Sequence, residues 1–221
     1  MNQEHEEMIA ESGGNFVLPP PGNHVATCIG MTMIGTQHFT YEGHAQSAKK
    51  VILSFELSNE KFAPKEGEPE INFVIHKEYT FSMNQNGNMR KALKGWKGSD
   101  FTPEEAKAYN ILRLLECSCL VNVVIVQKKD GGERADIVGL SPLPKGMDDP
   151  EMINKSFTFN ITSPNFNRVA FEALPKFIKK KVEDSDEYKA KVASGQITPA
   201  AATGQAAQAS STTASTKKHP F

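Results

Sequence analysis

The sequence has few of the features that mark secreted, membrane-spanning or metal-binding proteins. Its three cysteines, Cys28, Cys117 and Cys119, lack the spacing of a disulfide framework or a zinc site. The first residues are acidic and contain no apolar stretch of the secretory kind, and no apolar run approaches the length of a membrane span. We therefore expect a cytoplasmic protein with free thiols and no bound metal.

The sequence also lacks a strong excess of charge and the common catalytic motifs. The formal net charge is -1 over 221 residues, so any contact with nucleic acid must come from a local basic patch. No phosphate-binding glycine loop, HExxH motif or Gly-x-Ser-x-Gly motif occurs. Asp148, Asp149 and Glu151 leave a metal-dependent nuclease as an alternative, but acids in such a loop are more often simply solvated. We expect a protein that is not an enzyme and uses no cofactor.

Proline, glycine and low-complexity segments divide the chain into four parts. We expect a disordered N-terminus over 1–15, a folded domain over 16–145 and a C-terminal extension over 146–194 that packs on this domain. Residues 195–221 are rich in Ala, Thr, Ser, Gln and Gly, a composition that predicts a disordered tail.

Alternating apolar residues predict five strands in the folded domain, over 24–39, 49–58, 73–83, 117–127 and 134–140. Between the third and fourth strands, Thr102, Pro103 and Glu105 predict the start of a helix that ends near Glu116. The order strand-strand-strand-helix-strand-strand is that of the OB-fold, a partly open five-stranded barrel. The expected class is therefore mainly β with helices. The extension should add a strand over 157–161 and one helix from 171 to 192, running past Pro175.

We expect the segment 72–101 to organise the domain. It predicts a strand, a turn, a short basic helix and a loop that holds the only tryptophan, Trp96. Basic residues beside aromatic rings are typical of a surface that neutralises phosphates and stacks bases. A half-buried strand followed by a solvated helix explains the same pattern. Tyr79 and Phe81 share the core side of the strand and should be buried, and we favour Trp96 as a plug at the end of the barrel over a ring that lies against a base.

In an OB-fold the ligand face is the outer face of strands 2 and 3 with the loops around it. This geometry and the basic helix together define the candidate residues. The candidates for nucleic-acid binding are Phe39, Tyr41, Lys49, Lys50, His76, Lys77, Arg90, Lys91, Lys94, Trp96, Lys97, Lys128, Lys129 and Arg134. The run 179–181 is most simply a solvated helix face, with phosphate contact as the alternative.

Four segments follow one another in a characteristic order: KEYTFSMNQNGNMRKALKGWKGSDFTPEEA, ECSCLVNVV, IVGLSPLPKGM and FEALPKFIKKKVEDSDEYK. Over about residues 16–190 they resemble a family of bacteriophage single-stranded-DNA-binding proteins with an OB-fold. The matching positions are Tyr79, Arg90, Leu93, Trp96, Gly98, Phe101, Leu174, Pro175 and the segment 185–188.

The resemblance implies sequence-tolerant coating of single-stranded DNA during phage replication or recombination. It also implies recruitment of replication or recombination proteins through a Pro-Phe end, here Pro220 and Phe221. Lys217 and Lys218 stand where such proteins often carry acids, which is a departure from the family pattern. A non-catalytic protein-interaction module or virion component remains the alternative function.

Overall fold

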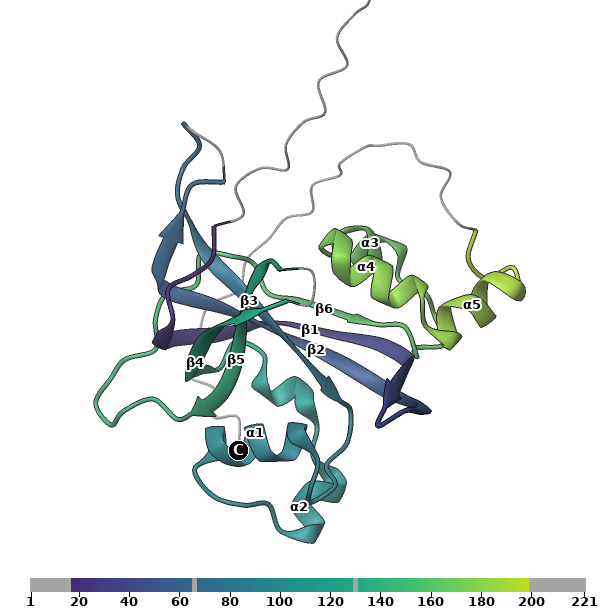
Figure 1. The fold of residues 1–221 in the computed structure, drawn as a ribbon, viewed down its shortest axis with the longest axis horizontal. Helices are drawn as coiled ribbons and strands as arrows, with labels where there is room; N and C mark the ends of the chain where they lie inside the picture. The colour runs from purple at the N-terminus through teal and green to yellow at the C-terminus, as the bar shows by residue number, and fades with distance from the viewer. Residues whose placement is uncertain (1–16, 65–66, 129–130, 199–221) are drawn as a thin grey trace, which may run out of the picture.

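The computed structural model describes residues 17–64, 67–128 and 131–198, and it is mainly β (Figure 1). The strands are β1 (Gly22–Tyr41), β2 (His44–Phe62), β3 (Ile71–Thr80), β4 (Ser118–Gln127), β5 (Glu133–Ser141) and β6 (Phe157–Asn160). The helices are α1 (Asn88–Lys97), α2 (Pro103–Ala108), the 3-10 helix η1 (Ile111–Leu114), α3 (Arg168–Glu172), α4 (Lys176–Glu183) and α5 (Asp186–Ala193). All six expected strands are present in the expected order.

One sheet contains all six strands. Its order is β3-β2-β1-β4-β5, with each neighbour antiparallel, and β6 adds parallel to β1. The central strand β1 pairs with β2 along one edge, while its other edge is shared by β4 and β6. Within the described residues no backbone pairing joins β3 to β5, so the sheet is not closed into a hydrogen-bonded barrel. The two end strands are instead bridged by Lys77, whose Nζ donates to Asp136 Oδ1 at 2.7 Å.

The first hydrophobic core lies between one face of the sheet and α1. Apolar residues of all five antiparallel strands meet there, among them Phe55 of β2 and Val121 of β4. Helix α1 presents Met89, Leu93 and Trp96 to this core, at helical spacings of four and three residues. Burial of these large side chains is the main source of stability for this part of the fold.

The second core lies on the outer face of β1 and β2, and the C-terminal extension supplies most of it. Ile34 and Ile52 of these strands contact residues of β6 and α3 to α5, including Phe171 and Ile178. Ile197 is only 3% exposed and belongs to the same cluster. Residues up to 197 thus pack on the fold, although the segment expected to be disordered began at residue 195; residues 199–221 lie outside the described residues.

The extension is also fixed to the sheet by buried or half-buried polar contacts. Glu56 of β2 is 1% exposed, and its carboxylate accepts hydrogen bonds from the backbone N–H groups of Ile153 and Asn154. At the far end of the extension, the Glu187 carboxylate accepts hydrogen bonds from the backbone N–H and the hydroxyl of Thr36. Charge-assisted hydrogen bonds of this kind are among the strongest in proteins, so they define where the extension sits.

The helix expected from Thr102 to Glu116 is shorter than its apolar spacing suggested. Thr102 and Glu105 form the expected capping box, but α2 ends at Ala108. Asn110 then caps a separate 3-10 helix, because its side chain accepts a hydrogen bond from the Leu112 N–H. An asparagine side chain competes with the helical backbone in this way, and Leu112 is consequently exposed.

The late helix is likewise divided into three helices rather than one. Pro175 is the N-cap residue of α4, and the Ser185 hydroxyl caps α5 by accepting from the Tyr188 N–H.

The central segment, 72–101, also differs from expectation at two points. Trp96 lies on α1 and not in a loop, and Phe81 is exposed because β3 ends at Thr80.

Candidate nucleic-acid interface

The structure divides the predicted binding residues into two groups on different sides of the sheet. In Figure 1, α1 and α2 lie beneath the sheet, whereas α3 to α5 lie above its right-hand part. The basic residues of α1 are therefore separated from those of β2, β3 and β5. A contiguous site can contain one group or the other, so the geometry of each group decides which is the better candidate.

The basic residues of α1 mainly hold the loop that follows the helix. Arg90 is largely buried and donates to the carbonyls of Met83 and Phe101 and to the Asp100 carboxylate. Lys94 also donates to Asp100, at 3.1 Å. The backbone N–H of Phe101 and these two cations lower the pKa of Asp100. Arg90 therefore holds the loop in place, which makes it a weak candidate for a phosphate contact.

Lys97 and Lys91 complete the α1 group. Lys97 is 2.8 Å from Glu105 and lies over the ring of Phe101, so it too is occupied, whereas Lys91 is exposed. The contact with Lys97 lowers the pKa of Glu105. Most of the positive charge of this helix is thus neutralised locally, which makes α1 a weak candidate for phosphate binding.

Trp96 is a core residue. The residue is 2% exposed, its Nε1 donates to the Ser118 carbonyl at 3.1 Å, and its ring centroid lies 5.8 Å from that of Phe55. The plug interpretation therefore describes its position, and the ring is not accessible to a base. A buried indole whose N–H has a partner is a common way to complete a small core.

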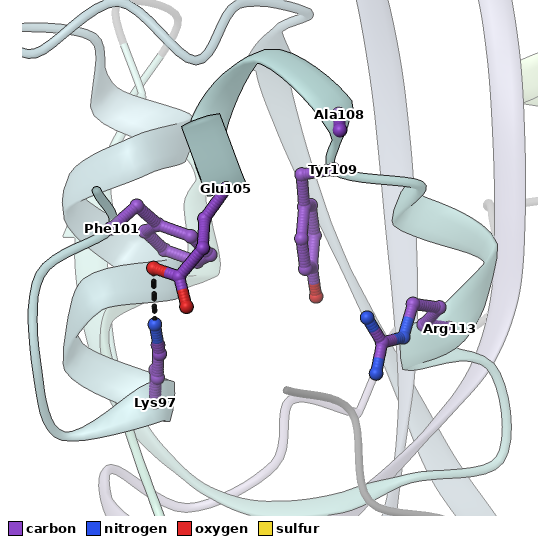
Figure 2. Close-up of a pocket in the computed structure, with 6 residues that line it drawn as sticks. All are labelled: Lys97, Phe101, Glu105, Ala108, Tyr109 and Arg113. Carbon is purple, nitrogen blue, oxygen red and sulfur yellow. Dashed lines mark hydrogen bonds and ion pairs between the residues drawn. The ribbon is translucent and has the colours of Figure 1, made fainter. Parts of the chain in front are cut away.

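A small pocket lies beside α1, between α2 and η1 (Figure 2). Its volume is about 130 Å³, and its lining residues are Lys97, Phe101, Glu105, Ala108, Tyr109 and Arg113. Burial raises the pKa of Tyr109, so its hydroxyl remains protonated at neutral pH. The pocket is smaller than typical small-molecule sites, which occupy about 300–1,000 Å³.

His76 lies on the outer face of β3, as predicted, but it does not carry a positive charge at neutral pH. Its Nδ1 is 2.8 Å from the Ser54 hydroxyl, and its ring meets Phe177 of α4 edge-on, with the centroids 5.0 Å apart. Burial lowers the pKa of His76 from 6.5 to about 4. His76 is therefore a neutral packing residue at neutral pH, which makes it a weak candidate for a phosphate contact.

Two carboxylates, one on each end strand of the sheet, are each flanked by two basic side chains. Glu78 of β3 is 2.7 Å from Lys181 of α4 and 3.9 Å from Lys50 of β2. Asp136 of β5 is 2.7 Å from Lys77 and 3.6 Å from Arg134. We call this group of four bases and two acids the cationic belt. It consists of Lys50, Lys77, Arg134, Lys181, Glu78 and Asp136.

The cationic belt consists of two triads, because Lys77 and Glu78 are consecutive on β3 and point to opposite faces of the strand. One triad, Glu78 with Lys50 and Lys181, lies on the outer face under α4. The other, Asp136 with Lys77 and Arg134, lies where β3 approaches β5. Four bases against two acids leave a local surplus of two positive charges, although the whole chain is close to neutral. Arg134 and Lys181 are about half exposed, with side-chain exposures of 53% and 44%. Both can therefore turn from a carboxylate toward a phosphate without unfolding the sheet, since exposed ion pairs hold their partners weakly.

The hairpin of β1 and β2 projects past the belt as a two-stranded arm. The Lys49 carbonyl still accepts from the Phe81 N–H, and beyond residues 35 and 49 the two strands pair only with each other within the described residues. Lys50 Nζ lies 4.6 Å from the centroid of the Phe39 ring, and Tyr41 near the tip is 56% exposed. A shallow hollow of about 370 Å³ is lined by residues 38–40 and 45–47, and Lys49 is exposed beside it. The arm thus brings two rings and two lysines to one side of the belt.

The hairpin of β4 and β5 is the other predicted loop. Lys128 is exposed, and its N–H donates to the Gly132 carbonyl across the turn. Lys129, Pro220 and Phe221 lie outside the described residues. Of the predicted residues, those that the structure brings together are Lys50, Lys77 and Arg134, with Phe39, Tyr41 and Lys49 on the adjoining arm.

The structure also shows where the acidic loop and the cysteines, the candidates for metal binding, lie. Asp148, Asp149 and Glu151 are exposed, and no three His, Cys, Asp or Glu side chains in the described parts of the chain gather as metal ligands would. The three cysteines are buried, and burial raises the pKa of Cys28 and Cys119. No helix in the described ranges is long and apolar enough to cross a membrane.

Comparison with family models finds no match to this chain, and neither does a search of curated proteins. The assignment of a function therefore depends on the chain's own residues.

Sequence reasoning missed the part that α4 plays in the candidate interface. Lys181 pairs with Glu78, and Phe177 packs on His76, so α4 covers part of the face predicted to bind ligand. The signal was present in the spacing, because residues 177 and 181 lie on one side of a helix. Their partners on β3 cannot be identified from the sequence, since about a hundred residues separate them.

Proposed function

We propose that this protein binds single-stranded DNA without strong sequence preference, through the cationic belt and the adjoining arm. The observation that carries the proposal is the sharing of Glu78 and Asp136 by four bases on three strands and a helix. A phosphate that approaches the belt replaces a carboxylate as the partner of Arg134 or Lys181. Each such replacement releases counterions from the nucleic acid, which favours binding most at low salt.

The fold supports the same proposal. The first strand pairs with both the second and the fourth, and a helix lies between the third and the fourth along the chain. The two end strands of the sheet, β3 and β5, are bridged by the Lys77 and Asp136 side chains. We infer that the sheet is a partly open OB-fold barrel, in which the face of strands 2 and 3 and the hairpins beside it bind oligonucleotides. The resemblance to phage single-strand-binding proteins points to coating of DNA during replication or recombination.

A direct test measures the binding of labelled oligo(dT) by fluorescence anisotropy, with duplex DNA and RNA of the same length as competitors. We expect single-stranded DNA to bind best and its affinity to fall steeply as salt is raised. Absence of single-strand binding at low salt would overturn the proposal. Cleavage of the probe on addition of magnesium would instead support the nuclease alternative.

Single substitutions, with a matched control, test which surface binds the DNA. Arg134→Gln and Lys181→Gln should each reduce the salt slope by about 0.7, the value expected for one lost contact with a single strand. Lys94→Gln is a matched control, because Lys94 is also exposed and also paired with an aspartate, but lies on α1. A reduced slope for Lys94→Gln with no change for the other two would place the site on α1 instead.

The exposed arm favours a second candidate function, as a protein-interaction or virion module. Both edges of the arm are unpaired in the described residues, and an unpaired strand edge is a template for pairing with another chain. Association through the arm should depend little on salt, unlike phosphate binding. Sedimentation at two salt concentrations, without DNA, separates the two candidate functions. The interaction module is favoured if the protein self-associates at high salt and does not bind oligo(dT).

A further inference from the structure

Helix α4 carries an exposed aromatic ring beside the cationic belt. Phe177 is 47% exposed, although the residues that follow it on the inner side of the helix, Ile178 and Val182, are fully buried. Exposure alone is not a signal, since Tyr41 and Phe81 are also exposed; what distinguishes Phe177 is its place beside the bases of the belt.

The register between α4 and β3 fixes where this ring lies. Phe177 contacts His76, and Lys181 contacts Glu78, so helix and strand run in the same direction. Four residues of helix rise about 6 Å, and two residues of strand advance about 7 Å, so the two pairs match in spacing. The ring is therefore held one helical turn from Lys181, at the edge of the belt.

The contacts of Phe177 hold the ring in place without covering it. The His76 ring meets it edge-on, and the low pKa of His76 keeps that contact between two uncharged rings at neutral pH. Gln37 further fixes the helix, since its Nε2 donates to the Lys181 carbonyl at 2.8 Å. A ring that is already positioned loses little freedom when a ligand stacks on it.

We propose that Phe177 is a base-stacking platform, and that Lys180 and Lys181 contact the phosphates on either side of the stacked base. The proposal rests on the proposed single-strand binding and adds α4 of the C-terminal extension to the site. Stacking suits a sequence-tolerant binder because every base has a flat aromatic face. Lys180 is exposed and lies three residues after Phe177, on the side of the helix away from Ile178.

An abasic oligonucleotide separates stacking from phosphate contact, because it keeps the backbone and lacks the bases. We expect the native chain to bind oligo(dT) more tightly than an abasic strand of the same length. Phe177→Leu should weaken oligo(dT) binding by about 5- to 150-fold and leave abasic binding unchanged. Leucine retains an apolar contact with His76, and the thermal melt of the variant checks that the fold is kept.

A second measurement does not depend on loss of affinity. Phe177→Trp should place an exposed tryptophan at the platform, and its fluorescence should be quenched by oligo(dT) but not by the abasic strand. Among the lysines, Lys180→Gln should lower the salt slope, whereas Lys179→Gln should not, because Lys179 points to the other side of α4 and pairs with Glu172.

The outcomes distinguish this inference from the proposed function. If the native chain binds neither probe, single-strand binding itself is refuted. If it binds both probes equally, or if Phe177→Leu weakens both by the same factor or neither, then Phe177 does not stack on bases and the inference is overturned. Quenching of the Phe177→Trp variant by the abasic strand as strongly as by oligo(dT) overturns it as well.

Discussion

Acidification should destabilise this protein through His76, before most of its carboxylates titrate. Burial lowers the pKa of His76 from 6.5 to about 4 in the folded state. Between these values the unfolded chain binds a proton that the folded chain does not, so stability rises with pH across this window. The shift of about 2.5 units corresponds to at most about 3 kcal/mol at 1.36 kcal/mol per unit.

This loss can be traced to the contact between β3 and α4. A protonated His76 faces the Phe177 ring and the Ser54 hydroxyl, and the nearest bases on the same face are Lys50 and Lys181. Neither Phe177 nor Ser54 supplies a negative charge. The acids on the same face are Glu78, two residues along β3, and Glu56, diagonally across on β2, and the Glu56 carboxylate already accepts from two backbone N–H groups, so compensation is partial. The positive charge is therefore poorly stabilised, and the protein should unfold more readily as the pH falls from 6.5 toward 4.

Urea denaturation at closely spaced pH values measures the effect. The native chain should lose up to about 3 kcal/mol of unfolding free energy across the window. His76→Gln cannot be protonated there, so its stability should be nearly flat over the same range, whatever its absolute value. Parallel curves for the native chain and His76→Gln would show that another group is responsible and would refute the argument from burial.

Two further predictions concern the first core. The emission of Trp96 should be blue-shifted and should not change on addition of oligo(dT), because the ring is buried and its N–H is bonded to the Ser118 carbonyl; strong quenching would show that the ring is accessible. Leu93→Ala should lower the free energy of unfolding, measured by chemical denaturation, by about 2–5 kcal/mol, because Leu93 is fully buried. Leu112→Ala, at an exposed leucine, should change it by less than about 0.5 kcal/mol. Equal losses would contradict the observed burial.

The strands could be predicted because each has at least one face on a core, and β1 and β2 have a core on both faces. Alternation of apolar residues is a direct consequence of that arrangement, and it located all six strands to within a few residues. The helix after Thr102 was harder, because leucines and isoleucines continue at helical spacing after the chain has left the helix. Only the local hydrogen bond from the Leu112 N–H to the Asn110 side chain ends the pattern, and the same residues would otherwise fit a longer helix.

The candidate site was only partly predictable, for a related reason. The cluster of basic residues in the sequence suggested α1 as the binding site. In the structure these bases pair with acids that follow the helix, Arg90 with Asp100 and Lys97 with Glu105. The cationic belt joins residues that are far apart in the sequence, such as Lys181 and Glu78. Spacing along a chain reveals contacts within one helix or hairpin, whereas contacts between distant elements require the topology.

The pairing of β1 with three strands has a consequence for how the chain assembles during synthesis. Its last partner, β6, ends at Asn160, so the sheet cannot be completed until most of the chain has left the ribosome. Ile34 and Ile52 remain uncovered until the following helices arrive. Such late, long-range contacts slow folding and leave apolar surface open to aggregation. Chains truncated before residue 157 should therefore accumulate as aggregation-prone, incompletely folded species and not as a smaller folded domain.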